Sequence, residues 1–234
     1  MRYPRLLHAA MLAMAAAACG SARGAAGPDP VSTSEATGAP SHHATGGADT
    51  TARGHSAADV AFLQGMIHHH AQALVMVGMI PSRTARSEMR MLGQRIAVSQ
   101  RDEIASMRRW LASRGEYAPS VDSAGVHVHG AHGAEAAPMV HDATHQDMPG
   151  MIGSEDLARL AAETGDAFDR LFLELMIRHH DGALVMVRTL FATVGAAQES
   201  ELFDIASEVD ADQRAEIERM RAMLRTLTGG AQGR

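Results

Sequence analysis

The sequence predicts an all-α fold, a four-helix bundle built from two repeated helical hairpins. A twelve-residue block occurs twice: residues 66–77 read MIHHHAQALVMV and residues 176–187 read MIRHHDGALVMV, with nine identical positions. The segments that follow both blocks share the pattern Gln-x-x-Glu-Ile-x-x-Met, which begins at Gln100 and again at Gln213. Aromatic residues make up only 3% of the chain, and an aliphatic, Met-rich core suits helices better than sheets. A lone hairpin leaves its apolar stripe uncovered, so two hairpins are expected to pack together.

Helical periodicity, proline and glycine define the expected helices. Pro81 is expected to end the first helix and Gly115 the second. Ser154 is the expected N-cap of a short helix that ends near Gly165. The five expected helices cover residues 59–80, 84–114, 154–165, 166–192 and 197–227.

The first 19 residues have the features of an export signal. Arg2 and Arg5 precede an apolar run, and small residues lead directly to Cys19, the only cysteine in the chain. This end resembles the lipobox of bacterial lipoproteins, in which the cysteine is lipidated after cleavage. An ordinary secretory signal is the alternative. We therefore expect an exported protein of the cell envelope or periplasm, held at a membrane by a lipid on Cys19, with no disulfide supporting its fold.

The rest of the chain divides by composition. Residues 20–56 are rich in Gly, Ala, Ser, Thr and Pro without apolar periodicity, which predicts a flexible tether. The hairpins are expected at 57–116 and 153–228, with a His- and Met-rich linker at 117–152, and 57–228 form one bundle domain. The net charge of −6 and the lack of a basic cluster argue against nucleic-acid binding. The sequence leaves open whether the hairpins pair within one chain or swap between two copies in a homodimer.

Helix geometry predicts which histidines face the core. At 100° per residue, two histidines of the first block share a face with Met66, whereas His68 lies on the opposite side. The second block supports this assignment, because Arg178 replaces His68 while both inward histidines recur. The four inward histidines are His69, His70, His179 and His180.

Further polar residues share the apolar face of the bundle. Gln100 and Glu103 lie in the aliphatic stripe of the second helix, where an unpaired polar group costs roughly 1–3 kcal/mol. They are expected to pair with Asp59 and the inward histidines across the hairpin. The whole predicted set of such residues is Asp59, Gln100, Glu103, Asp169, Gln213 and Glu216, which act as additional ligands or orient the ligands.

Two matched pairs of inward histidines favour a metal site over a buried hydrogen-bond network alone. Adjacent histidines on a helix diverge by 100°, so one of each pair is expected to bind metal while the other bonds to a carboxylate that fixes its tautomer. Methionines at helical spacing either fill space in the core or act as soft ligands. The candidates are Met66, Met76, Met176 and Met186.

The linker holds further candidate ligands. Thioethers select Cu(I), imidazole serves Cu(I) or Cu(II), and zinc would more usually recruit cysteine or carboxylate. Copper in either oxidation state is therefore the expected cofactor, ahead of zinc or iron. A weak, unselective chelating stretch is the alternative to a defined linker site. The linker candidates are His127, His129, His132, Met139, His141, His145, Met148 and Met151.

The chain resembles the family catalogued as domain of unknown function 305. The family pattern is an Asp followed by Phe, then Met-Ile-x-His-His, then Ala and Met, with Gln and Glu in the following helix. This chain supplies it twice, as Asp59, Phe62, Met66, His69, His70, Ala73, Met76, Gln100 and Glu103, and as Asp169, Phe172, Met176, His179, His180, Ala183, Met186, Gln213 and Glu216. The resemblance covers about residues 57–227 except the linker and implies a ferritin-like four-helix bundle. Because the family includes periplasmic copper-binding proteins of the CopM type, it also implies copper binding and export.

Three functions follow from these observations. The first is an envelope protein that sequesters copper or transfers it between copper donor and acceptor proteins. The second is a ferritin-like di-iron oxidoreductase, although the Glu-x-x-His motif of such sites is missing from the sequence. The third is a metal-free helical interaction module. An enzyme is not expected, because the sequence shows no nucleophile elbow, phosphate loop or Ser-His-Asp arrangement.

Overall fold

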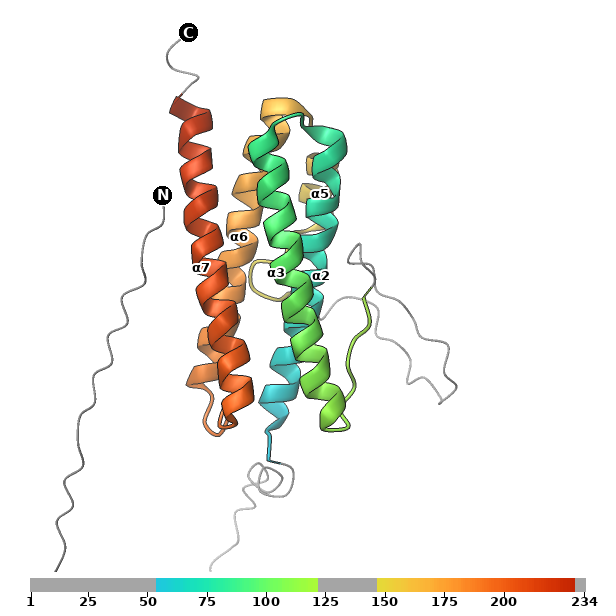
Figure 1. Ribbon diagram of the computed structural model, residues 1–234, viewed down its shortest axis with the longest axis vertical. Coiled ribbons are helices and arrows are strands. Elements are labelled where there is room, and N and C mark those ends of the chain that lie inside the picture. Colours follow the sequence, from blue (N-terminus) through green and yellow to red (C-terminus); the bar gives the residue numbers. More distant parts are fainter. Residues whose placement is uncertain (1–53, 122–146, 230–234) are drawn as a thin grey trace, which may run out of the picture. The chain divides into compact units, whose positions relative to one another are not determined.

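Four long helices form the bundle (Figure 1). The computed structural model describes residues 54–121 and 147–229. The long helices are α2 (Ala57–Arg83), α3 (Ser87–Ser113), α6 (Gly165–Ala192) and α7 (Ser200–Gly229), and the short α5 (Ser154–Ala162) precedes α6. Helices α2 and α3 form one hairpin and α6 and α7 the other, and the hairpins meet where α2 packs against α6 and α3 against α7. The predicted all-α bundle of two hairpins is confirmed.

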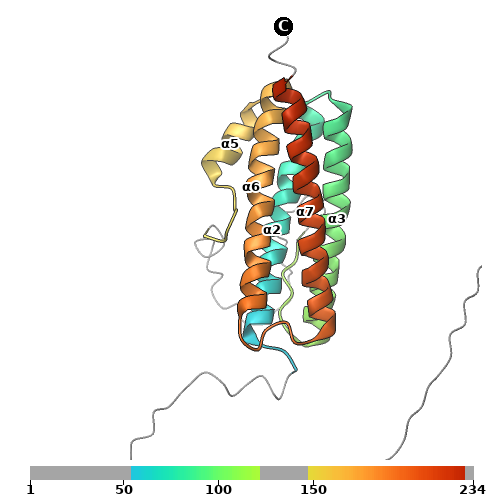
Figure 2. The ribbon, with the colours of Figure 1, turned by 90° about the vertical axis from the view of Figure 1, so that its left-hand side faces the viewer.

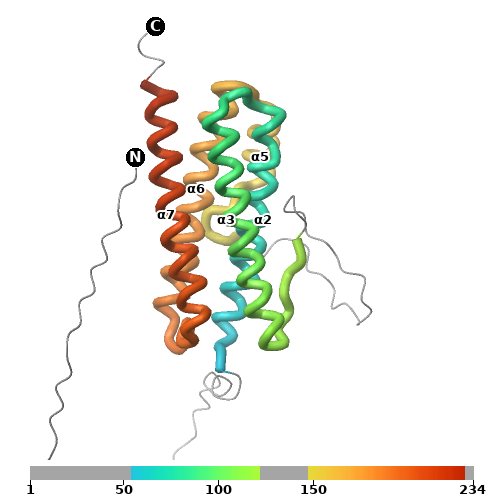
Figure 3. Tube along the Cα trace, in the orientation of Figure 1, coloured from blue at the N-terminus to red at the C-terminus, as the bar shows by residue number. Residues whose placement is uncertain are grey.

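Neighbouring helices run in opposite directions. Figure 3 shows α2 rising, α3 and α6 descending and α7 rising again. The start of α2 therefore lies beside the end of α6, and the two repeats are related by an approximate two-fold axis. Within residues 54–121 and 147–229, no helix has the length and apolar character to cross a bilayer.

The helix ends differ from the expected ones by up to three residues. Helix α2 continues through Pro81 to Arg83, because a proline in the last turn removes only one backbone hydrogen bond. The expectation that Pro81 ends the helix is therefore wrong by three residues. Gly153, not Ser154, is the N-cap of α5. Gly115 follows α3 with a φ of 73°, which confirms it as the stop of that helix.

A polar layer divides the interior into two apolar clusters. On α2, Met66 and Ile67 belong to one cluster and Ala73 and Met76 to the other, and the buried histidines lie between them. The other three long helices follow the same order, with their polar residues between two apolar stretches. The members of this polar layer are His69, His70, Gln100, Glu103, His179, His180, Gln213 and Glu216.

Asp59 holds the two hairpins together at one end of the bundle. Its Oδ2 accepts a hydrogen bond from the Ser56 N–H at 2.8 Å and completes a capping box at the start of α2. Its Oδ1 accepts one from the Ala197 N–H at 2.7 Å, in the connection between α6 and α7. The prediction that Gln100 and Glu103 pair with Asp59 is therefore wrong, because both Asp59 oxygens serve backbone N–H groups.

Asp169 makes the equivalent contact at the opposite end. Its Oδ2 accepts a hydrogen bond at 2.9 Å from Nε of Arg86, which lies in the connection between α2 and α3. Arg86 also pairs with Asp166 at 2.6 Å. Each repeat thus uses the aspartate at the start of its first helix to bind the turn of the other repeat. Asp169, like Asp59, is a structural residue and not a partner of the histidines.

The last residues of the expected tether belong to the folded part. His55 is buried, and its Nε2 lies 3.0 Å from Glu116 Oε1, while its ring meets the edge of Trp110 at a centroid distance of 5.3 Å. Ser56 is the N-cap of α2. The expected boundary at residue 56 is therefore too late, because the bundle already includes residues 54–56.

Replacing Asp59 with Ala should lower the free energy of unfolding by about 1–3 kcal/mol, because the cap is lost and the Ala197 N–H loses its partner. Chemical denaturation measures this change. Asp210→Ala is the matched control, since Asp210 only pairs with Arg214 on the surface of α7 and should cost less than about 1 kcal/mol. Equal losses in the two variants would contradict the role of Asp59.

Candidate metal centre

The four inward histidines form a row across the middle of the bundle. Each is at most 1% exposed. The ring centroids of His70 and His69 are 6.4 Å apart, those of His69 and His179 3.8 Å, and those of His179 and His180 6.0 Å. The central rings, one from each repeat, are inclined by 38°. The row thus runs from one hairpin to the other through the contact of His69 with His179.

A carboxylate holds each end of the row. His70 Nε2 is hydrogen-bonded to Glu103, and His180 Nε2 to Glu216 Oε2 at 2.6 Å. A carboxylate accepts, so each Nε2 carries a hydrogen, and in a neutral ring Nδ1 keeps its lone pair. These contacts are the pairing that the sequence predicted, and they are the arrangement that orients metal-binding histidines in proteins.

All four Nδ1 atoms lack a hydrogen-bond partner among the described residues. His69 donates from Nε2 to the carbonyl oxygen of Pro149 at 3.0 Å, so its Nδ1 also holds a lone pair. Neither ring nitrogen of His179 has a partner among those residues. A buried, unsatisfied nitrogen costs about 1–3 kcal/mol, and four of them in one layer require an explanation. The lone pair of neutral imidazole is the group that binds metal.

Burial keeps the two central rings neutral. It lowers the pKa of His69 from 6.5 to about 3, with His70 and His180 adding to the effect and the Pro149 carbonyl opposing it. Burial also lowers the pKa of His179 well below 6.5, with smaller contributions from the other three rings, while the nearby His69 backbone opposes the shift. Both rings are therefore unprotonated at neutral pH, in the form that a metal can bind without displacing a proton.

The two glutamines of the layer do not make the expected contacts. Gln100 is 1% exposed, and neither atom of its amide has a hydrogen-bond partner in the part of the chain that the structure describes. Gln213 is equally buried, and its Nε2 has none there either. The prediction that these amides pair with the histidines is therefore wrong, and the layer contains further unused polar groups.

The candidate methionines occupy two environments. Met66, Met76 and Met176 are fully buried in the apolar clusters, whereas Met186 is partly buried. Met148 and Met151 lie in the segment before α5 and are also partly buried. The other candidates, His127, His129, His132, Met139, His141, His145 and Cys19, lie outside the described residues.

The described residues contain no group of three or more His, Cys, Asp or Glu side chains placed to hold one ion. Each Glu of the layer is already bonded to a histidine, and the central rings contact each other at a centroid distance of 3.8 Å. A cation at this layer would therefore take few nitrogen ligands.

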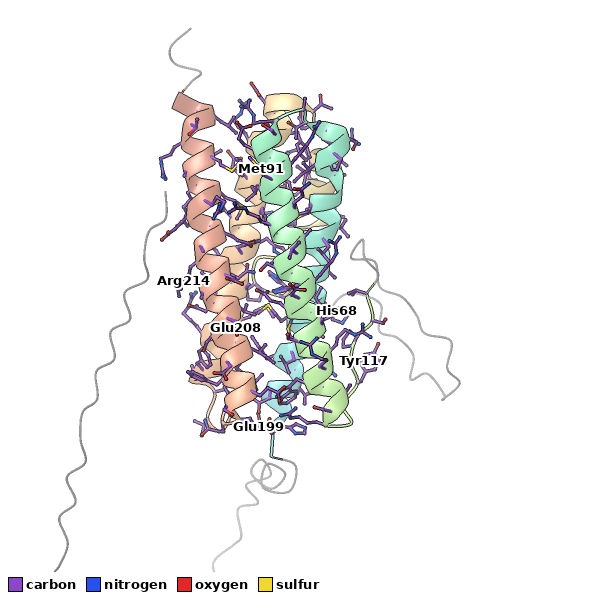
Figure 4. All side chains as sticks on the ribbon, in the orientation of Figure 1. His68, Met91, Tyr117, Glu199, Glu208 and Arg214 are labelled. Atoms are coloured by element: carbon purple, nitrogen blue, oxygen red, sulfur yellow. The ribbon has the colours of Figure 1, made fainter. Side chains whose placement is uncertain are left out.

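The layer has an open side and a covered side. A groove of about 740 Å³ between α3 and α7 reaches Glu103 and Asp212, and Figure 4 shows Met91 and Glu208 on this side. Burial raises the pKa of Asp212, and Glu103 and Glu216 raise it further. On the α2–α6 side, residues 147–152, here named the cover segment, run beside α6 (Figure 2), and Pro149 of this segment accepts a hydrogen bond from His69. Neither Asp212 nor the cover segment was predicted from the sequence, in which residues 147–152 belong to the expected linker.

The pH dependence of folding reports the burial of the central histidines. In the unfolded chain they take up protons below a pH of about 6.5, whereas folded His69 does so only near 3. Between these two pH values the unfolded state binds more protons than the folded state. The free energy of unfolding, which is at its full value above pH 6.5, therefore decreases as the pH falls towards 3. The loss should reach about 1.4 kcal/mol per pH unit for each ring. Denaturation of metal-free protein at several pH values should show this slope in the free energy of unfolding. The slope should be smaller in a variant carrying His69→Leu and His179→Leu. Equal slopes would contradict it.

Comparison with known proteins identifies the family. Residues 59–224 match the family described as Domain of unknown function (DUF305). A crystal structure of a DUF305 fragment from Deinococcus radiodurans is similar at 28% identity and a TM-score of 0.57, over 73% of this chain and 97% of that one. A DUF305 protein from Streptomyces coelicolor, titled as secreted, is similar at 25% identity and a TM-score of 0.57, over 73% and 94%.

A third relative is similar at lower identity. A structure of CopM in its Cu(I)-bound form shares 22% identity and a TM-score of 0.50, over 72% of this chain and 96% of that one, which shows a common fold. No curated protein sequence matches the chain. The family match covers most of the chain, including both histidine blocks and all four long helices. The chain belongs to the DUF305 family.

Proposed function

We propose that this chain is an exported copper-binding protein of the cell envelope, which sequesters Cu(I) or transfers it to other proteins through the polar layer of the bundle. The observation that carries the proposal is the set of four buried Nδ1 atoms without a partner among the described residues. A structural network would use these lone pairs. A metal site keeps them free and fixes the opposite nitrogen, as Glu103 and Glu216 do here.

The donor set favours a soft monovalent cation. The buried imidazoles and the methionine thioethers suit Cu(I), and no cluster of oxygen or cysteine ligands for zinc occurs in the described part of the chain. CopM, which shares the fold, has structures with Cu(I) and with silver bound. The two described glutamates of the layer each bond to a histidine, which disfavours the carboxylate-bridged di-iron alternative.

Attachment to a membrane is the second part of the proposal. The lipobox-like end at Cys19 and the long segment before α2 support a protein that is lipidated on Cys19 and held near the membrane surface. Such a location would place the bundle beside copper donors and acceptors of the envelope. Low ligand number at the layer would allow the ion to exchange with them.

Replacing both central histidines with Leu should have opposite effects on Cu(I) affinity and on the free energy of unfolding. His69→Leu with His179→Leu should lower Cu(I) affinity at least tenfold, because a metal loses two nitrogen ligands. The same variant should gain about 1–3 kcal/mol in free energy of unfolding without metal, because unsatisfied buried nitrogens are removed. Competition with a Cu(I) chelator and denaturation at pH 7 measure the two quantities.

His68→Leu is the matched control, since His68 is on α2 but only partly buried and outside the layer. It should retain Cu(I) affinity. A double variant that is much less stable than the wild type yet binds Cu(I) equally well would show that the central histidines are structural, and the proposal would be wrong.

Lipidation makes a separate prediction. Cys19→Ala in the full chain should move the protein from the membrane fraction to the soluble envelope fraction, because no acyl chain can be attached. Mass spectrometry of the wild-type mature N-terminus should show an acylated cysteine at position 19. An unmodified N-terminus at another residue would instead indicate an ordinary secretory signal, without affecting the copper proposal.

A further inference from the structure

The cover segment is fastened to α2 by specific side chains. Gln72 donates from Nε2 to the Ile152 carbonyl at 2.9 Å, and its Oε1 accepts from the Ile152 N–H at 2.8 Å. One turn earlier, His69 bonds to the Pro149 carbonyl. The Ile152 side chain is 3% exposed and packs in an apolar cluster. The segment is therefore an ordered part of the fold.

Glycine on α6 creates the space for this segment. A methyl group at Gly182 would lie 2.1 Å from the Pro149 carbonyl oxygen and 2.5 Å from Gly150 Cα, closer than atoms can approach. Gly150 itself has a φ of 79°, and a methyl group there would lie 2.8 Å from the His179 carbonyl oxygen. The backbone of the cover segment thus lies directly on α6, beside the turn that carries His179.

The two repeats differ where this segment is bound. Of the three differences between the twelve-residue blocks, one places Gln72 opposite Gly182, and both of these residues hold the cover segment. A second places Arg178 opposite His68, and Arg178 binds Asp156 of α5 at 2.5 Å. The two repeats form a nearly two-fold symmetric surface, and these differences let it bind one cover segment in one orientation. Two of the three departures from the repeat therefore hold the cover segment or the helix that follows it.

The cover segment places the thioether of Met148 beside α2, one helical turn before His69. A methyl group at Gly65 would lie 3.2 Å from Met148 Sδ and 3.5 Å from Met186 Cε, so the two methionine ends meet over Gly65. Gly65 precedes His69 by one helical turn on the same face. Both methionines are partly buried, unlike the enclosed Met66. The Met148 sulfur and the Met186 methyl group thus lie one helical turn from His69, whose neighbour His179 has both nitrogens unpaired among the described residues.

We propose that Met148 and Met186 form a site for a soft monovalent cation at the edge of the histidine row, and that the cover segment is the movable wall of this site. The inference rests on the proposed function and adds the thioether ligands and the route. Because the segment carries Met148 and covers His69, its lifting exposes the central rings and moves one ligand. The ion therefore passes on the α2–α6 side, not through the α3–α7 groove.

Silver ion tests the ligands, since it is a redox-inactive probe for soft sites. Met148→Leu in the mature chain should lower Ag(I) affinity roughly 10- to 100-fold, because a soft ligand is lost while volume is nearly conserved. Met91→Leu is the matched control, because Met91 is 54% exposed and lines the groove on the opposite side. Competition titration measures both. If Met148→Leu binds Ag(I) like Met91→Leu, the thioether site is overturned.

Exchange kinetics test the movable wall. Gln72→Ala removes both hydrogen bonds to Ile152, so the Ile152 N–H should exchange with deuterium faster and transfer of Ag(I) to a chelator should accelerate roughly 5- to 100-fold. Gln94→Ala, in the α3–α7 groove, should change neither rate. Faster deuterium exchange with an unchanged Ag(I) transfer rate would overturn the wall, as would acceleration by Gln94→Ala alone.

These outcomes are distinct from failure of the proposed function. Wild-type protein that binds neither Cu(I) nor Ag(I) would refute copper binding itself. Wild-type binding that is lost in the double His→Leu variant but retained in Met148→Leu would leave copper binding intact and refute only the thioether site.

Discussion

The burial of four imidazoles in an aliphatic interior is the constraint on which the rest of the structure depends. Polar rings in a low-dielectric core cost free energy when they lack a hydrogen bond, as His179 does among the described residues. Here Glu103, Glu216 and Pro149 each satisfy one ring nitrogen and leave the other free. The two apolar clusters above and below supply the stability that a layer of this kind requires. An interior selected only for stability would replace these rings with leucine, so the layer indicates a function.

The approximate two-fold symmetry explains how one repeated motif builds both the polar layer and the four-helix bundle around it. Each repeat contributes two histidines, a glutamate and a clamping aspartate, and the antiparallel packing of α2 against α6 brings the central rings into contact. Asp59 and Asp169 fix the axial position of the hairpins, because each binds the turn of the other repeat. Within the twelve-residue blocks, the difference between Gln72 and Gly182 serves the cover segment. Symmetry therefore builds the layer, and its local loss determines which side is closed.

Much of the fold was predictable from the sequence because the repeat and the helical period agree. The angular position of each residue around α2 correctly places His69 and His70 in the core. The angular position of a residue does not tell how far along the helix axis it lies. Asp59 shares the inward face but lies ten residues before His69, about 15 Å away along the axis, so it caps the helix and cannot reach the ring. Pairing of Gln100 failed for a related reason, since a common face does not ensure contact across the hairpin.

The cover segment was not predictable from periodicity, because it has no regular secondary structure. The sequence feature that reflects this segment is the difference between Gln72 and Gly182. These two residues occupy equivalent positions in otherwise similar blocks. Only the structure shows that both residues contact the same backbone. The methionine environments also required coordinates, since helical spacing does not distinguish enclosed Met66 from partly exposed Met186.

The most direct measurement is the location of the ion by anomalous diffraction from crystals of the mature protein loaded with Cu(I). The account predicts an anomalous peak within the bundle, between α2 and α6 and beside the rings of His69 and His179. Peaks confined to the linker or the surface, with none at the polar layer, would contradict it.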